Sequence, residues 1–147
     1  AYPFDTLISH NRYTLLNRSA DALFSYAHDR GIAIFNAAPY AGGVLAKGSV
    51  SMPRITYQEA SDEGLNSVRA IESLCDHYNV PMGAAALQFS INDPRITSTL
   101  IGVSKGPRVF ETFDWMATSI PSDLLEFMHT IRYEVTDPEK MREYSAT

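Results

Sequence analysis

The sequence contains Ile101-Gly102-Val103-Ser104-Lys105-Gly106-Pro107-Arg108, a stretch with the pattern of a strand that ends in a glycine turn and opens onto a helix. The run before it, residues 96–101, is β-branched and apolar, which suits a strand buried in a parallel sheet. Unpaired N–H groups and the positive end of the dipole at a helix start attract anions, and Ser104, Lys105 and Arg108 would add donors there. The stretch predicts a phosphate site, with an ordinary solvated loop as the alternative.

Strands and helices alternate along the rest of the chain. Apolar runs predict further strands at 4–9 and 32–37, and a glycine-rich loop at 38–43 begins an irregular stretch that runs to about Tyr57. Apolar residues at helical spacing predict five helices: one capped by Ser19 and stopped by Gly31, one from about Ser61 to Asn79, one from Pro81 to the break at 92–94, and two at 107–117 and 121–134. A polar tail over 136–147 is expected to be frayed.

Such alternation implies an α/β fold with a parallel sheet and right-handed crossovers. The 147 residues have the size of one ordinary domain, but three strands leave two sheet edges and much apolar helix surface uncovered. Stable α/β folds use more strands or close into a barrel. We therefore expect the chain to be the C-terminal piece of a larger α/β domain.

Composition excludes several classes of partner. The net charge is −5 and Lys and Arg do not cluster, which argues against nucleic acid or an anionic membrane surface. No apolar run approaches the ~20 residues of a membrane span, and the first residues lack the pattern of a signal peptide, so a cytoplasmic protein is expected. The single cysteine, Cys75, lies among apolar residues at helical spacing and is expected to be a core thiol.

Four motifs carry a resemblance to a known family. They are residues 10–16 (HNRYTLL), 36–45 (NAAPYAGGVL), 86–90 (ALQFS) and 102–111 (GVSKGPRVFE). In this order and spacing they resemble the aldo-keto reductases, most of all the branch of aldose and pyridoxal dehydrogenases, over about residues 4–125. Members of this family are eight-stranded (β/α) TIM barrels. The resemblance implies that this chain supplies strands six to eight with their helices, and that an N-terminal part of the barrel is missing from it.

The resemblance also implies which chemistry lies elsewhere. Aldo-keto reductases pass hydride between NAD or NADP and a carbonyl or alcohol, such as that of a sugar. Their catalytic tyrosine, lysine, aspartate and histidine lie on strands two to four, before this chain begins. No catalytic residue is therefore expected here, and Tyr13 and Tyr40 are not assigned that role.

The resemblance places the cofactor on this part of the barrel, where loops after strands seven and eight commonly bind phosphate. His10 stands where the family usually has a glutamine that binds the nicotinamide carboxamide; a histidine satisfied by its own neighbours is the alternative. Ala37 replaces the usual tyrosine that stacks on nicotinamide. The backbone expected to hold the pyrophosphate belongs to Ala38, Pro39, Tyr40, Ala41 and Gly42.

The adenosine end of the cofactor is expected at the last strand. By resemblance the residues there are Gly102, Ser104, Lys105, Arg108, Glu111 and Thr112, the last in place of a usual asparagine. Arg108 would stack on adenine or pair with a 2′-phosphate. NADP-preferring members often carry a lysine at the position of Gly102, so NAD is favoured.

No metal site is expected. Glu126 and His129 have the spacing of a di-metal bundle motif, but that site needs a second copy of the motif, which the sequence lacks. Two function classes remain open. The chain is either the cofactor-binding part of an enzyme, or a non-catalytic truncated product or nucleotide-sensing or assembly module of the same fold.

Overall fold

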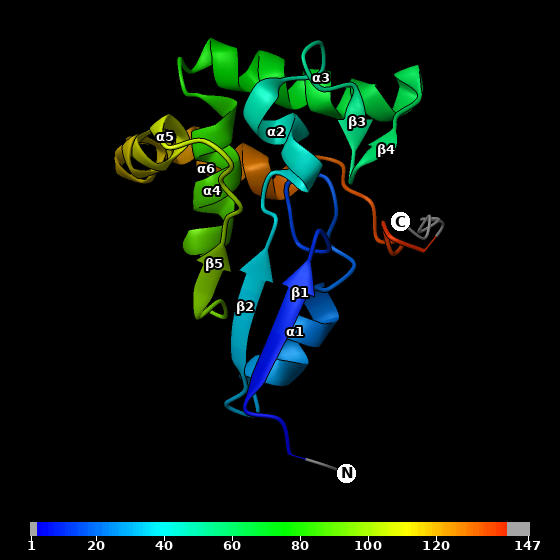
Figure 1. Cartoon of the computed structure of the whole chain (residues 1–147), viewed down its shortest axis with the longest axis vertical. Coiled ribbons are helices and arrows are strands. Elements are labelled where there is room, and N and C mark those ends of the chain that lie inside the picture. The colour runs from blue at the N-terminus through cyan, green and yellow to red at the C-terminus, as the bar shows by residue number, and fades with distance from the viewer. Residues whose placement is uncertain (1–2, 141–147) are drawn as a thin grey trace.

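A computed structural model describes residues 3–140, which form a three-stranded parallel sheet with helices packed against one of its faces (Figure 1). The strands are β1 (Thr6–His10), β2 (Ala33–Ala37) and β5 (Ser98–Leu100), in the spatial order β1-β2-β5. Both neighbouring pairs are parallel, which confirms the sequence prediction. The last strand is shorter than the predicted 96–101.

The helices agree with the predictions best where local sequence marks their ends. They are α1 (Asp21–His28), α2 (Val44–Lys47), α3 (Asp62–His77), α4 (Met82–Ile91), α5 (Pro107–Ala117) and α6 (Ser122–Thr130). α3 begins after Ser61, whose hydroxyl accepts a hydrogen bond from the Gly64 N–H, and α5 begins at Pro107 as expected.

The stretch between β2 and α3 is more ordered than the sequence predicted. It contains the 3-10 helix η1 (Ala41–Gly43), then α2, and then a small hairpin of β3 (Arg54–Ile55) and β4 (Gln58–Glu59). Thr56 and Tyr57 form the two-residue turn of this hairpin, both with positive φ. That turn type usually uses Asn and Gly, so the sequence offered no local reason to expect it.

The predicted cap of the first helix is wrong. Ala20, not Ser19, is the N-cap of α1, and it makes no side-chain capping bond. The Ser19 hydroxyl and backbone N–H both donate to the Asn17 side-chain oxygen, at 2.7 and 2.9 Å. Ser19 is therefore held in a local side-chain turn at Asn17, and the helix begins one residue later than predicted.

The last helix is shorter than the predicted 121–134. Arg18 explains the early end, because its guanidinium donates to the carbonyls of Met128 and His129 in the last turn of α6. Beyond the helix, Glu134 joins the segment after β1 through a hydrogen bond to the Leu16 carbonyl and one from the Arg18 N–H. Long-range backbone pairing thus replaces the final helical turn.

The two faces of the sheet differ in burial. Ile34 and Asn36 on β2 are fully buried against the helices, where Phe24 of α1 also lies. Alternate residues face the other way: Ile8 is 65% exposed, and its register partner Phe35 is only partly covered. Among the described residues, this second face and the outer edges of β1 and β5 have no covering layer, as expected for an incomplete sheet.

A buried polar network ties the segment after β1 to the turn before β5. The Tyr13 hydroxyl donates to Asp93 at 2.5 Å, and Arg95 donates to Asp93 and to Asp21 at 2.8 Å each. Burial by itself would raise the pKa of Asp93, but the hydrogen bonds from Arg95 and Tyr13 outweigh it and hold that pKa at about 2.

Candidate functional site

Three loops meet at the carboxyl ends of the parallel strands. His10, Ala37 and Leu100 are register partners across the sheet, so the segments that follow them start side by side. The Ala38 N–H donates to the Leu100 carbonyl at 3.1 Å, and the Asn11 N–H donates to the Ala37 carbonyl at the same distance. The structure therefore gathers the predicted segments at 10, 38–43 and 102–108 at one edge, as barrel enzymes do with their sites.

Backbone strain is concentrated at this edge. Among the described residues other than glycine, positive φ values occur at Asn11, Ala38, Ala41, Thr56, Tyr57 and Asn79. The first three directly follow β1 or lie in the loop after β2, and the hairpin turn is hydrogen-bonded to that loop through the Thr56 N–H and the Ala41 carbonyl, at 2.9 Å. Only Asn79, after α3, lies elsewhere. Strained residues that gather in this way mark a candidate functional site.

The space beside Gly42 is occupied by the hairpin turn. A Cβ on Gly42 would lie 2.8 Å from the Tyr57 nitrogen, and Gly42 has φ +79. The glycine makes room for the hairpin turn, which in turn places the Tyr57 ring 5.9 Å from the His10 ring at an angle of 17°.

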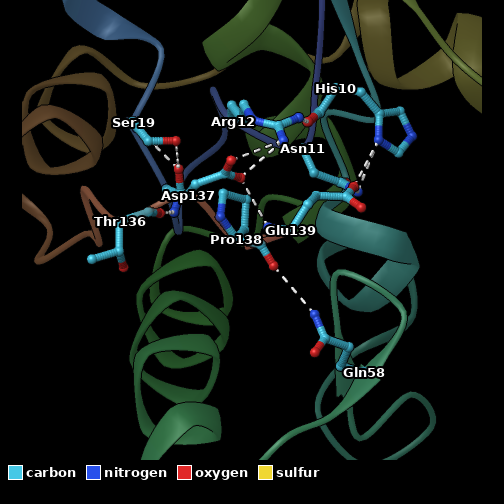
Figure 2. Close-up of polar contacts among 10 residues, drawn as sticks. His10, Asn11, Arg12, Ser19, Gln58, Thr136, Asp137, Pro138 and Glu139 are labelled. Carbon is cyan, nitrogen blue, oxygen red and sulfur yellow. Dashed lines mark hydrogen bonds and ion pairs between the residues drawn. The ribbon is translucent and has the colours of Figure 1, made fainter. Parts of the chain in front are cut away.

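His10 lies between the hairpin and the C-terminal segment (Figure 2). Its Nδ1 lies 3.0 Å from Glu139 Oε1, and its Nε2 lies 3.4 Å from the Tyr57 hydroxyl. Asn11 Nδ2 donates to the same Glu139 oxygen at 3.0 Å. His10 is 43% exposed, whereas the Glu139 side chain is only 7% exposed. The imidazole thus has defined neighbours and still reaches solvent.

The sequence did not reveal the role of the C-terminal segment. Residues 136–140 belong to the stretch expected to be frayed, yet Asp137 pairs with Arg12 at 2.9 Å. The Thr136 carbonyl accepts from the Asn17 amide at 2.8 Å. Residues 141–147 lie outside the described part of the chain. Contacts between residues more than a hundred positions apart leave no local pattern, so Glu139 could not have been found from periodicity or spacing.

Tyr40 links the loop after β2 to α5. Its ring packs edge-on against Trp115, with centroids 5.6 Å apart, and its buried hydroxyl oxygen makes no well-formed hydrogen bond within residues 3–140. Burial raises the pKa of Tyr40 to about 12; a weak hydrogen bond with the Thr112 hydroxyl opposes this shift, the Glu111 carboxylate adds to it, and the Arg108 guanidinium opposes it. Four predicted site residues on two elements therefore lie near one another, with the buried Tyr40 hydroxyl among them.

The loop before α5 makes few contacts. Gly102, Ser104 and Lys105 are exposed, and no described residue accepts a hydrogen bond from the backbone N–H groups of residues 102–106. Arg108 is partly buried, and its carbonyl accepts from the Thr112 hydroxyl at 2.8 Å. The loop thus presents free N–H donors and basic side chains at a helix start, which suits an anion.

Two residues of α4 fix α5 in place. A Cβ on Gly83 would lie 2.4 Å from the Trp115 ring, so the absence of a side chain lets the two helices meet. The Gln88 amide donates to the carbonyls of Trp115 and Thr118 at the end of α5, at 2.8 and 2.6 Å. These contacts hold the end of α5 that is remote from the predicted phosphate loop.

The other candidates carry no chemistry. Within residues 3–140, no group of three or more His, Cys, Asp and Glu side chains could hold a metal ion. Cys75 is buried, as predicted for a core thiol, and burial raises its pKa to about 11. A cavity of about 530 Å³ lies beneath the C-terminal segment, but Ala41 is the one predicted site residue on its wall.

Comparison with known proteins decides the family. The model of the Aldo/keto reductase family matches residues 3–131. The chain belongs to the aldo/keto reductase family. This aldo/keto reductase chain is 32% identical over 124 residues to pyridoxal 4-dehydrogenase of Microbacterium luteolum. The aligned region covers 84% of the chain and 35% of that protein. The chain is 26% identical over 122 residues to D-threo-aldose 1-dehydrogenase of a Pseudomonas species, which covers 82% and 37%.

Solved structures agree on the fold. The chain superimposes on an aldo-keto reductase from Bacillus halodurans in its holo form with a TM-score of 0.70 at 16% identity, covering 95% of this chain and 44% of that one. The apo form gives 0.69 at 17% identity, with 95% and 47% covered. This aldo/keto reductase chain spans less than half the length of these relatives. Within residues 3–140, none of its helices has the length and apolar composition that crossing a bilayer requires.

Proposed function

We propose that the chain is the cofactor-binding part of an NAD(P)-linked aldo/keto reductase that oxidises an aldose or similar small alcohol, or reduces the matching carbonyl. One observation carries the proposal: strained backbone gathers where the three parallel strands end, on the loops after β1 and β2 and on the hairpin bonded to them. Strain of this kind persists where the surroundings hold a site in one geometry. The chemical class follows from the family to which the chain belongs.

In this proposal β1, β2 and β5 are strands six, seven and eight of an eight-stranded barrel. The exposed face that carries Ile8 would then be the barrel interior, and an N-terminal part of the barrel would cover it and pair with the outer edges. The short coverage of the longer relatives supports this assignment.

The proposed cofactor lies across the ends of all three strands. His10 contacts the nicotinamide carboxamide, the backbone of 38–42 holds the pyrophosphate, and Gly102, Ser104, Lys105, Arg108, Glu111 and Thr112 bind the adenosine end. Within the described part of the chain, the N–H groups of 102–106 donate to no backbone carbonyl and the Tyr40 hydroxyl makes no well-formed hydrogen bond, which fits a ligand rich in hydrogen-bonding oxygens. When bound, the nicotinamide would supply or accept the hydride.

Proton transfer to the substrate is proposed to come from residues outside this chain. The groups described here would bind and orient the cofactor, and the buried Tyr40 phenol, with its pKa raised to about 12, is poorly suited to exchange protons near neutral pH. NAD is the favoured cofactor because Gly102 offers no cation to a 2′-phosphate.

Cofactor titration tests the proposed site directly. On adding NAD to the ¹⁵N-labelled chain, amide resonances of residues 38–43 and 102–108 should shift. Arg108→Ala should weaken binding by roughly 1–3 kcal/mol, the range for hydrogen bonds to charged groups. Arg30→Ala is the matched control, because Arg30 is exposed just before β2, at the opposite end of the strands, and stacks on Tyr26. Equal dissociation constants for parent and Arg108→Ala would contradict the placement of this loop.

Turnover measurements test whether the catalytic residues lie outside this chain. The isolated 147 residues should show no cofactor-dependent change in absorbance at 340 nm with any aldose or aldehyde, because positioning alone does not replace general acid catalysis. Turnover by chain that is free of longer species would contradict the assignment of the catalytic residues to a missing part.

A further inference from the structure

The C-terminal residues 134–139 form a clasp across the end of β1. The clasp is held from several directions: Glu134 by the segment after β1, Asp137 by Arg12, and the Pro138 carbonyl by the Gln58 amide at 3.2 Å. Figure 2 shows that these contacts bring Glu139 directly beside His10. The clasp therefore carries a nearly buried carboxylate to the side chain proposed to contact the cofactor.

The carboxylate determines which ring nitrogen of His10 carries the proton. A carboxylate oxygen only accepts, so a separation of 3.0 Å between Glu139 Oε1 and Nδ1 requires a hydrogen on Nδ1. Asn11 Nδ2 also donates to that oxygen and lies 3.2 Å from Nδ1. Without a hydrogen on Nδ1, the Nδ1 lone pair and the Glu139 carboxylate oxygen, both acceptors, would lie at hydrogen-bond distance from each other. Of the two neutral tautomers, the geometry thus favours the one with hydrogen on Nδ1.

In this neutral tautomer the opposite nitrogen, Nε2, carries a lone pair and acts as a hydrogen-bond acceptor. His10 Nε2 faces the Tyr57 hydroxyl at 3.4 Å, a distance at which that hydroxyl donates weakly. Tyr57 is held there by the strained hairpin turn and is itself nearly half exposed. A ligand with a better N–H donor would compete for Nε2 without any rearrangement of the clasp.

We propose that Glu139 is a positioning residue that holds His10 with hydrogen on Nδ1, so that Nε2 accepts a hydrogen bond from the amide NH₂ of the cofactor carboxamide. This inference rests on the proposed function for the identity of the ligand. A glutamine at position 10 would offer the carboxamide both a donor and an acceptor, whereas His10 in this tautomer offers an acceptor alone. The cofactor amide is thereby bound through its NH₂ and not through its carbonyl.

The tautomer can be measured without any ligand. Long-range ¹H–¹⁵N correlation spectra of the chain above the titration range of histidine should show His10 Nδ1 as the protonated nitrogen. Glu139→Ala should move the proton to Nε2, the form that predominates in free histidine side chains, and Glu139→Gln should retain it on Nδ1 because the amide oxygen still accepts. Asp62→Ala is the control, since it removes an exposed carboxylate that pairs with Arg69 on α3 and leaves the contacts of the clasp in place. A proton on Nε2 in the parent, or no change in Glu139→Ala, would overturn the proposal.

Cofactor analogues test the ligand. 3-Acetylpyridine adenine dinucleotide keeps the carbonyl and replaces NH₂ with a methyl group, so the parent chain should bind NAD about three- to tenfold more tightly than the analogue. Glu139→Ala should lose this preference because Nε2–H then donates to the carbonyl of either compound. Equal affinities in the parent would overturn the ligand assignment. If the parent binds neither compound, the proposed function fails together with the ligand assignment, while the spectra still decide the role of Glu139.

Discussion

The two ends of the proposed cofactor site are built in opposite ways. At the end of β1, His10 is bracketed by Glu139 from the clasp and by Tyr57 from the hairpin. At the end of β5, residues 102–106 donate no backbone hydrogen bond to any described residue, and the far end of α5 is held by Gln88 and Gly83 of α4. The first end is held by its own contacts, whereas we expect the second to gain its contacts only when a ligand binds. Ordering the second end would reduce the free energy of cofactor binding, whereas the first end requires no such ordering.

The largest expected effect comes from the polar network that ties the segment after β1 to the turn before β5. Asp93→Ala removes the acceptor of Tyr13 and Arg95, and should lower the free energy of unfolding by about 3 kcal/mol, near the low end for breaking a buried pair because Asp21 still pairs with Arg95. Chemical denaturation measures it. Asp62→Ala, which removes an exposed pair with Arg69, is the control and should cost less than about 1 kcal/mol.

The same network predicts a dependence of stability on pH. The pKa of Asp93 is lowered to about 2 in the folded chain, below its ordinary value near 4. A lowered carboxyl pKa stabilises the fold above the ordinary value, and this stabilisation is lost as pH falls from about 4 through about 2. Denaturation midpoints measured across this range should therefore fall less steeply in Asp93→Asn than in the parent. Parallel profiles would contradict the pairing.

Gly83→Ala should loosen only the part of the proposed cofactor site that follows β5, through a shift of α5. The added methyl group would overlap the Trp115 ring, which an α-helical backbone cannot relieve without moving α5, so the variant should lose about 1–3 kcal/mol of stability. Amide resonances of α5 should shift, while those around His10 should not. Gly102→Ala is the matched control because a Cβ there meets nothing within 4 Å. Equal stabilities for the two variants would show that Gly83 and Trp115 do not set the position of α5.

Gly42→Ala should loosen only the part of the proposed cofactor site around His10, at the carboxyl end of β1. Alanine is strained at φ +79, and its Cβ would meet the backbone nitrogen of Tyr57, so a cost of about 1–2 kcal/mol is expected. The hairpin should move away from His10, which spectra of the Tyr57 and His10 rings would report. Gly64→Ala, inside α3 with contacts of 3.5 Å or more, is the control. Unchanged ring resonances in Gly42→Ala would separate the hairpin from the site.

The smallest effect is expected at the rim of the clasp. Arg12→Ala breaks the pair with Asp137, and because both side chains are substantially exposed the cost should stay below about 1 kcal/mol. Proteolysis near the C-terminus should still accelerate, since the clasp loses one of its anchors. A large loss of global stability would contradict the description of this pair as an outer contact.

Local signals in the sequence account for most of the fold. Ser61 and Pro107 mark the starts of α3 and α5 because a cap and a helix-compatible ring act within a few residues. The apolar strand at 32–37 and the resemblance in four motifs likewise predicted the sheet order and the family. The predicted cap at Ser19 is wrong because the Ser19 hydroxyl donates to the neighbouring Asn17 side chain, and the helix begins one residue later, after Ala20.

The contacts around His10 could not be predicted in the same way. Glu139 reaches His10 across 129 positions, and the turn at Thr56 and Tyr57 lacks the residues that usually announce it. Tertiary contacts, and not local sequence preferences, determine both the position of Glu139 and the backbone conformation of this turn. The sequence therefore predicted which segments meet at the site, and the roles assigned to the individual residues remain predictions.

The open edges of the sheet have a consequence for association. β1 presents one unpaired edge and β5 another, and within the described residues each copy of the chain therefore carries two different, complementary surfaces that run in the same direction. Pairing the β5 edge of one copy with the β1 edge of the next is a head-to-tail contact, which has no twofold symmetry and stops only if the rotation closes a ring. Strands contributed by other polypeptide would fill both edges at once and end that growth.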